Sequence, residues 1–358
     1  MEQSRAEQSR AEQSRAERLP EIDILKGIGI ISVVIGHAVN TDNFYSVPAE
    51  YIRRFVYLYH LAVFFFCSGY LLRAKSLKNI ILRFVKQYVM FLLICISSFV
   101  LIPLWLKTNI VEWIGIRGLL IKIKHILLFR LDGYFTGAMW FMPFMAIASA
   151  LYSIILNIKE KSNILYYLVV FVSGVLGIIL VSARGIGRYY IWLALLMIPI
   201  MAIGNEYDRI KGVVKHQRIP VFAVVFTMLL ICIKGEIELS KGIIYGRIAF
   251  YPVILLGLLF CIQLKDSLLK ISILSTIFEL IGRNSMYIMG YHFIAFKIID
   301  AIMSIFCKTS VEQLRLFPYS FPQCRVLYIL GGLLIPCLIG LAISRINEYI
   351  KDRSGAQE

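Results

Sequence analysis

Long apolar stretches separated by short polar segments recur along the chain from about residue 22 to residue 344. Each stretch approaches the length of roughly 20 residues that an α-helix needs to cross the hydrocarbon core of a bilayer. We predict ten membrane-spanning helices, at residues 22–39, 54–72, 87–106, 139–157, 164–182, 189–204, 219–234, 248–264, 285–306 and 326–344. The pattern therefore predicts an all-α fold, a polytopic integral membrane bundle of about ten transmembrane helices.

Polar segments at the two ends divide the chain into three parts. Residues 1–21 contain three copies of Glu-Gln-Ser-Arg-Ala, a unit that buries no apolar surface, so we expect a disordered cytoplasmic tail. Residues 22–345 are expected to form the transmembrane domain, and residues 346–358 a cytoplasmic C-terminal tail. The first apolar stretch has no small-residue cleavage site after it, so we expect it to remain as the first helix.

Composition supports a membrane protein, with 59% hydrophobic residues among 358 and a mean hydropathy of +0.76. The net charge is +16, but the Lys and Arg residues cluster in the short connections. That distribution is typical of topology signals and lipid headgroup contacts, so no nucleic-acid partner is expected. A cytoplasmic N-terminus gives a modest cytoplasmic excess of positive charge. The basic segment 107–138 is the exception on the outer side, and its amphipathic part, 114–129, indicates an interfacial helix or a miscounted span.

Three of the five histidines, His37, His60 and His292, lie in apolar helices. An ionisable side chain at such depth is costly and is by default a functional hypothesis. The alternative for each one is a structural histidine bonded to a neighbouring carbonyl. His125 and His216 lie in polar connections, where we expect solvated side chains. The first three are therefore the candidate catalytic residues.

Lys26 and His37 share one face of the first helix. Eleven residues at about 100° each make roughly three turns plus 20°, and they separate the two residues by about 16 Å along the axis. The same helix carries three small residues, Gly29, Ser32 and Gly36. Small residues let a neighbouring backbone or a slender ligand approach closely. The alternative for Lys26 is that its side chain extends to the headgroups while it pairs with Asp23.

Four motifs carry a family resemblance: IDILKGIGIISVVIGH (22–37), YHLAVFFFCSGYLLR (59–73), MWFMPF (139–144) and LIGRNSMYIMGYHF (280–293). In this order they resemble membrane-bound acyltransferase family 3, particularly its branch similar to fucose 4-O-acetylases. The first-helix motif of that family is an Arg and a His with ten residues between them, and it maps onto Lys26 and His37. Lysine keeps the charge of the arginine but loses its bidentate fork. The second motif often reads His-Met-Pro, whereas this chain has His60-Leu61-Ala62.

The resemblance implies a membrane O-acetyltransferase that moves an acetyl group from cytoplasmic acetyl-CoA to a sugar hydroxyl. It places the protein in the inner membrane of a bacterium, with a surface or lipid-linked polysaccharide as acceptor. The O-antigen of lipopolysaccharide is favoured over capsule or exopolysaccharide. Acetyl transfer needs a base for the hydroxyl proton, donors for the developing oxyanion and cations for the CoA phosphates. No metal is expected, because the seven cysteines form no metal-ligand spacing.

We assign the base to His37, and expect His60 or His292 to orient substrate or supply a hydrogen bond. We expect the CoA phosphates to bind the basic residues Lys26, Arg73, Lys75, Lys78 and Arg83, with the pantetheine arm along the small residues of the first helix. The last four are equally expected as topology signals. The substrate-binding candidates are Trp140, Asn284 and Ser68. Interface anchoring is the alternative for Trp140, and helix packing for Ser68. The sequence leaves direct transfer and an acetyl-histidine intermediate both open.

Two other classes of protein compete with the enzyme. A transporter that relays protons through its histidines predicts inverted internal repeats, and the sequence shows no such symmetry. A flippase for a lipid-linked glycan shares the basic connections but gives no reason for the histidine motifs.

The N-terminal repeat also predicts a property of the gene. Ala-Glu-Gln-Ser-Arg is encoded by GCA GAG CAG AGC AGA, which is the unit GCAGA repeated. A tandem tract of that kind shifts the reading frame when one unit is gained or lost, so expression would switch on and off. Such phase variation suits an enzyme that modifies an exposed antigen. The alternative is a tolerated polar repeat written in mixed codons.

Overall fold

The structure is a computed structural model of the 358-residue chain. It describes residues 19–39, 46–105, 110–129, 137–185, 190–216, 219–307, 310–314 and 316–355. The repeat tail, expected to be disordered, lies outside these residues except for its last three positions. Helices dominate the described chain, and its only β-type pairing is one isolated bridge. The all-α prediction is confirmed.

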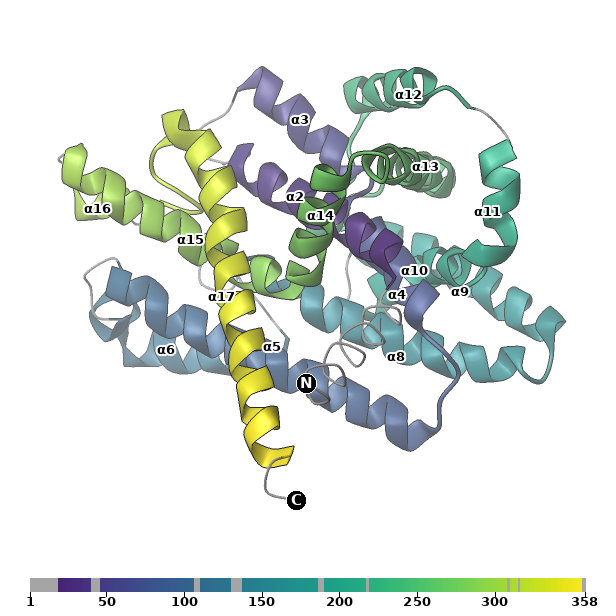
Figure 1. Ribbon diagram of the computed structural model, residues 1–358, viewed down its shortest axis with the longest axis horizontal. Helices are drawn as coiled ribbons and strands as arrows, with labels where there is room; N and C mark the ends of the chain where they lie inside the picture. The colour runs from purple at the N-terminus through teal and green to yellow at the C-terminus, as the bar shows by residue number, and fades with distance from the viewer. Residues whose placement is uncertain are drawn as a thin grey trace, which may run out of the picture.

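The helices follow one another through the bundle shown in Figure 1. In chain order they are α2 (Pro20–Val39), α3 (Val47–Tyr57), α4 (His60–Leu71), α5 (Leu77–Trp105), α6 (Ile110–Leu127), α8 (Phe141–Lys159), α9 (Asn163–Arg184), α10 (Ile191–Asn205), α11 (Tyr207–His216), α12 (Val221–Lys234), α13 (Phe250–Leu268), α14 (Ser272–Arg283), α15 (Ser285–Phe306), α16 (Val311–Leu314) and α17 (Arg325–Gly355).

Eight helical segments in the described residues are long and apolar enough to cross a membrane, and α10 and α12 are shorter apolar helices. Together these ten correspond in order to the ten predicted spans. The second span consists of two helices, α3 and α4, which meet at Leu58 and Tyr59. Large apolar side chains on the outer helices remain exposed, among them Leu93, Phe171 and Phe226. These surfaces face lipid in a membrane protein.

Several helices extend or add to the predicted elements. α5 begins at Leu77, so Lys78 and Arg83 belong to a helix and not to a connection. α17 continues to Gly355 and includes most of the segment predicted as a C-terminal tail. The basic segment 107–138 contains α6, which is not among the membrane-crossing candidates of the described chain. Of the two alternatives for this segment, an interfacial helix fits this finding better than a miscounted span.

Helix α14 packs closely along α2, in a stretch where we predicted no element. Glycines make this approach possible: a Cβ atom at Gly27 would lie 2.3 Å from the carbonyl oxygen of Phe278. A Cβ atom at Gly282 would lie 1.8 Å from the carbonyl oxygen of Asp23. Most of α2 is buried among its neighbours (Figure 1). The first helix is therefore a central element, held at its N-terminal half by α14.

A buried ion pair fixes the connection between α15 and α17. Lys297 donates to Asp300 at 2.8 Å, and Asp300 also accepts from the backbone N–H of Ser320 at 2.9 Å. The next residue back, Tyr319, donates its hydroxyl to the carbonyl oxygen of Ala38 at 2.6 Å. Since a buried charge pair is tolerated only when its remaining polar atoms are bonded, this network holds the connection against the end of α2.

Candidate active site

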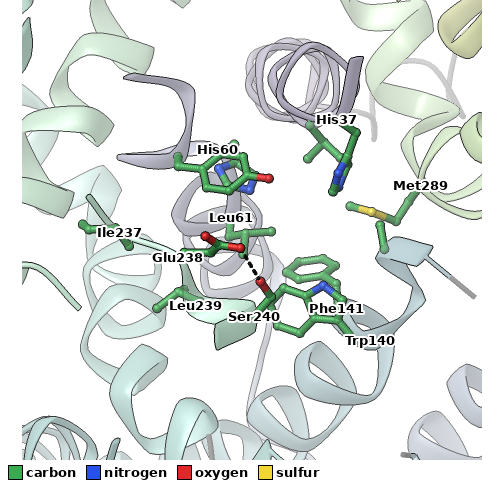
Figure 2. A pocket seen from close by; sticks show the side chains of 13 residues that line it. His37, His60, Leu61, Trp140, Phe141, Ile237, Glu238, Leu239, Ser240 and Met289 are labelled. Carbon is green, nitrogen blue, oxygen red and sulfur yellow. Dashed lines mark hydrogen bonds between the residues drawn. The ribbon is translucent and has the colours of Figure 1, made fainter. Parts of the chain in front are cut away.

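A small cavity of about 40 Å³ lies at the C-terminal end of α2, and two of the predicted histidines line it. His37 comes from α2 and His60 from the start of α4 (Figure 2). The full lining is Val33, His37, Tyr57, His60, Leu61, Ala138, Trp140, Phe141, Ile237, Glu238, Leu239, Ser240 and Met289. This volume exceeds the roughly 10–15 Å³ that a cavity needs to hold one water molecule, so hydroxyl-sized polar groups fit beside the histidines.

His60 is held in one tautomer by its own helix turn. Its Nδ1 lies 3.0 Å from the carbonyl oxygen of Val56. A carbonyl oxygen only accepts, so Nδ1 carries the hydrogen and Nε2 carries the lone pair. The ring also packs on Tyr57, with 4.5 Å between ring centroids. The bonded histidine anticipated as an alternative is present here, and the bond leaves Nε2 able to accept a hydrogen bond.

His37 is half-buried and has ring neighbours on one side. Its imidazole stacks on that of His292 at 5.4 Å between centroids and meets Phe293 edge-on at 5.0 Å. His292 is fully buried and does not line the cavity. Its Nδ1 donates to the carbonyl oxygen of Ile288 at 2.8 Å, and its Nε2 has no hydrogen-bond partner among the described residues. His37 lines the cavity, whereas His292 packs against the ring of His37 outside the cavity lining.

The three histidines converge without forming a metal site. Nowhere in the described chain do three His, Cys, Asp or Glu side chains group closely enough to hold a metal ion.

A larger cavity of about 340 Å³ lies toward the N-terminal end of α2. Its lining is Lys26, Phe64, Cys67, Ser68, Leu71, Gln87, Phe141, Met142, Met145, Gly282, Arg283, Ser285, Met286 and Met289. Phe141 and Met289 line both cavities, so these two side chains stand between them. The side chain of Met289 is unbranched, and methionine side chains change conformation at low cost.

Two cations, Lys26 and Arg283, line the larger cavity, and both approach the carboxylate of Asp23, which does not line it. Lys26 donates to Asp23 at 3.1 Å, as anticipated by the alternative for this lysine, and it also lines the cavity. The Nε of Arg283 lies 3.7 Å from the second oxygen of Asp23, and its Nη2 contacts Glu279. Arg283 therefore brings to this place the guanidinium that position 26 lacks.

Three of the other predicted phosphate-binding residues lie on the surface near the same end of the bundle, and the fourth, Arg83, is half-buried. Arg73 is exposed and donates to the carbonyl oxygen of Tyr70 at 2.6 Å, while Lys75 and Lys78 are exposed. One guanidinium nitrogen of Arg83, Nη1, is buried without a hydrogen-bond partner among the described residues. Arg83 lies four residues before Gln87, which lines the larger cavity, so both residues share one face of α5. Of the five predicted cations, Lys26 alone lines this cavity.

The predicted substrate-binding residues separate in space. Trp140 lines the small cavity and stacks on Phe144, with 5.8 Å between centroids. Ser68 lines the larger cavity, where its hydroxyl lies 3.3 Å from that of Ser149. Asn284 lines neither of the two cavities and donates to the carbonyl oxygen of Leu280 at 2.9 Å.

The small residues of α2 do not border an open path for a slender ligand. A Cβ atom at Gly29 would lie 3.1 Å from the ring of Phe64, and one at Gly36 would lie 2.7 Å from the ring of Tyr57. Ser32 bonds to the hydroxyl of Tyr59 at 3.0 Å. The expectation that the pantetheine arm of CoA lies along these small residues is wrong, because aromatic rings fill the space beside them. The two cavities instead approach each other at Phe141 and Met289.

Sequence reasoning missed several residues of both cavities. Glu238 and Ser240 reach the small cavity from the connection between α12 and α13, which the sequence presents only as a short polar segment. Arg283 was visible as part of a polar cluster before α15, but its place beside Lys26 depends on α14. No local signal marks these contacts, because each joins segments that are distant in the chain.

Comparison with protein families identifies the chain. The model of the acyltransferase domain of acyltransferase family 3 matches residues 19–345. The chain therefore belongs to this family and is a membrane acyltransferase, as the four motifs indicated. Searches among curated proteins and among solved structures gave no match.

Proposed function

We propose that the protein transfers an acetyl group from cytoplasmic acetyl-CoA to a sugar hydroxyl of a bacterial surface polysaccharide, with the lipopolysaccharide O-antigen favoured. The observation that carries this proposal is the pair of cavities along α2. The larger one contains Lys26 and Arg283, and the smaller one contains His37 and His60. An anionic donor and a hydroxyl acceptor thus each have a site of matching chemistry.

The donor binds in the larger cavity. Lys26 and Arg283 hold the CoA phosphates there, because charged hydrogen bonds to phosphate are strong and Arg binds it in a bidentate manner. Arg73, Lys75, Lys78 and Arg83 add positive charge around that end of the bundle. The thioester end passes between Phe141 and Met289 to reach His37. The distance is suitable for an extended arm, since Lys26 and His37 are about 16 Å apart along the helix.

The transfer takes place in the small cavity. An imidazole nitrogen of His37 takes the proton of the sugar hydroxyl as its oxygen attacks the acetyl carbonyl carbon. The new C–O bond forms, the C–S bond breaks, and the imidazolium returns its proton to the leaving CoA sulfur. His60 accepts a hydrogen bond at Nε2 and orients the acceptor, and the indole N–H of Trp140 is a donor for the developing oxyanion. His292 positions His37 by stacking.

Deletion of the gene tests this function. We expect O-acetyl groups on the purified surface polysaccharide to disappear in the deletion strain and to return when the gene is supplied on a plasmid. Purified protein should also transfer label from [14C]acetyl-CoA to polysaccharide taken from the deletion strain. An unchanged acetyl content after deletion, together with no transfer in vitro, would refute the proposal and favour the transporter or flippase.

A further inference from the structure

The connection between α12 and α13 forms a rigid hairpin at the edge of the small cavity. Glu238 and Ile243 exchange two backbone hydrogen bonds, at 2.9 and 3.0 Å. Gly242 adopts a positive φ of 71°, which a tight turn of this kind requires. The side chains of Ile237 and Leu239 are buried on either side of Glu238. The hairpin is therefore anchored, and the position of Glu238 is fixed by the fold.

Glu238 is 8% exposed and directs its carboxylate into the cavity of the histidines (Figure 2). One oxygen accepts from Arg53 at 3.0 Å, and the other accepts from Ser240 at 3.3 Å and Lys241 at 3.1 Å. An ionised carboxylate accepts about four hydrogen bonds. One acceptor position therefore remains for a ligand, and the hydroxyl of Ser240 also keeps lone pairs for one.

Arg53 holds the carboxylate of Glu238 in place. This arginine is buried and bonds Glu50 and Glu236 in addition to Glu238. Its guanidinium also lies 5.2 Å from the centroid of Tyr57, the ring that packs on His60. Arg53 thus contacts both the carboxylate of Glu238 and the end of α3, the helix that precedes His60.

We propose that Glu238, with Ser240, is the residue that selects the acceptor by binding a second hydroxyl next to the one that is acetylated. This inference rests on the proposed function. A carboxylate accepts from sugar hydroxyls but cannot donate, so the acceptor must carry a neighbouring hydroxyl donor. The site therefore takes a neutral sugar unit with adjacent hydroxyls. It disfavours a unit with a carboxylate or phosphate at that place, because two anions repel.

The chain offers a matched control for this assignment. Glu236 lies on the same hairpin and bonds the same arginine, but it does not line the cavity. Glu236→Gln and Glu238→Gln each remove one charged partner of Arg53 and leave two others. If only Glu238→Gln weakens acceptor binding, the effect comes from the carboxylate that faces the cavity. If both variants weaken it equally, the effect comes from the loss of a charged partner of Arg53.

The test measures acetyl transfer from [14C]acetyl-CoA to unacetylated polysaccharide from the deletion strain, at varied concentrations of each substrate. We expect Glu238→Gln to raise the apparent KM for polysaccharide about tenfold or more, the size of one lost hydrogen bond to a charged group. The KM for acetyl-CoA should stay unchanged, because the donor binds in the other cavity. Glu236→Gln should match the unaltered protein in both KM values.

Ser240→Ala provides a second variant that leaves the charges intact, and we expect it to raise the same KM by about threefold. Size-exclusion profiles in detergent report whether each variant is folded. Equal KM values for polysaccharide in Glu238→Gln and Glu236→Gln, with an unchanged value in Ser240→Ala, would overturn the assignment. If the unaltered protein transfers no acetyl group to polysaccharide, the proposed function fails and this inference fails with it.

Discussion

The surroundings of His37 differ from those of the other two buried histidines. His60 and His292 each donate Nδ1–H to a carbonyl oxygen four residues earlier, whereas no residue of the described chain hydrogen-bonds the ring of His37. A ring without such a bond has both nitrogens available for a substrate. This difference in bonding makes His37 the best candidate for the base.

His37→Ala should reduce acetyl transfer about 100-fold or more, the usual effect of losing a general base. The amount of protein in the membrane should stay near normal, because the ring makes no hydrogen bond that the fold needs. Transfer to polysaccharide and immunoblots of membranes measure the two effects. His125→Ala, on α6 away from both cavities, is the control. Near-full activity in His37→Ala would eliminate this residue as the base.

Lys26→Met should raise the apparent KM for acetyl-CoA severalfold while the KM for polysaccharide stays constant, because a phosphate loses one cationic partner. Lys26→Arg should keep most of the affinity, since the charge remains. Lys161→Met, at an exposed turn after α8, is the control for loss of one positive charge. An unchanged KM for acetyl-CoA in Lys26→Met would leave this lysine only its pairing with Asp23.

At the residue scale, the sequence predicted the histidines but not their partners. A buried histidine is conspicuous because apolar residues surround it in the chain. Glu238 is not conspicuous, since its partner Arg53 lies 185 residues away and no local pattern indicates the contact. Ionisable residues in apolar segments are therefore found from sequence, whereas those in polar connections are found only from the fold.

At the scale of elements, apolar length located the ten spans but could not locate α14. This helix has 12 residues, too few to cross a bilayer, so a search for spans passes over it. Its apolar residues Ile273 and Ile277 recur at helical spacing, and its glycine meets the backbone of α2. Helical periodicity, examined separately from span length, was the available signal.

Gly282→Ala should lower the stability of the protein by about 1–3 kcal/mol, as expected for an added group in a packed contact. The new Cβ atom would meet backbone atoms of α2, including the carbonyl oxygen of Asp23 at 1.8 Å, and the backbone cannot move aside cheaply. Thermal unfolding in detergent measures the change.

Gly212→Ala is the control for this substitution. A Cβ atom at Gly212, on α11, meets nothing within 4 Å. Alanine favours a helix over glycine by about 1 kcal/mol, so this variant should be as stable as the unaltered protein or more so. Equal melting temperatures for Gly282→Ala and the unaltered protein would contradict the close packing of α14 on α2.

At the scale of the whole molecule, the N-terminal repeat leads to a hypothesis about how the gene is expressed. We propose that its gene segment is an unbroken tract of GCAGA units that varies in number and switches the enzyme on and off. Sequencing this tract in sibling colonies, with the acetyl content of each colony's polysaccharide, should show copy number and acetylation changing together. Codons that interrupt the five-nucleotide period would refute the switch and leave a tolerated polar tail.

The arrangement of the two cavities also concerns the whole molecule, because they lie toward opposite ends of α2 and share Phe141 and Met289. We propose that the enzyme takes its donor from one face of the membrane and its acceptor from the other. The basic residues around the larger cavity favour the cytoplasmic face for the donor. A transporter would move a substrate through the same partition, whereas the proposed enzyme moves only the acetyl group.

The most direct measurement uses sealed proteoliposomes with unacetylated polysaccharide trapped inside and [14C]acetyl-CoA supplied only outside. The account predicts that label appears on the trapped polysaccharide, while His37→Ala vesicles and protein-free vesicles remain unlabelled. Those two controls exclude labelling that does not depend on the active enzyme. Label that appears only when acetyl-CoA and polysaccharide are on the same side of the membrane would contradict transfer between the two cavities.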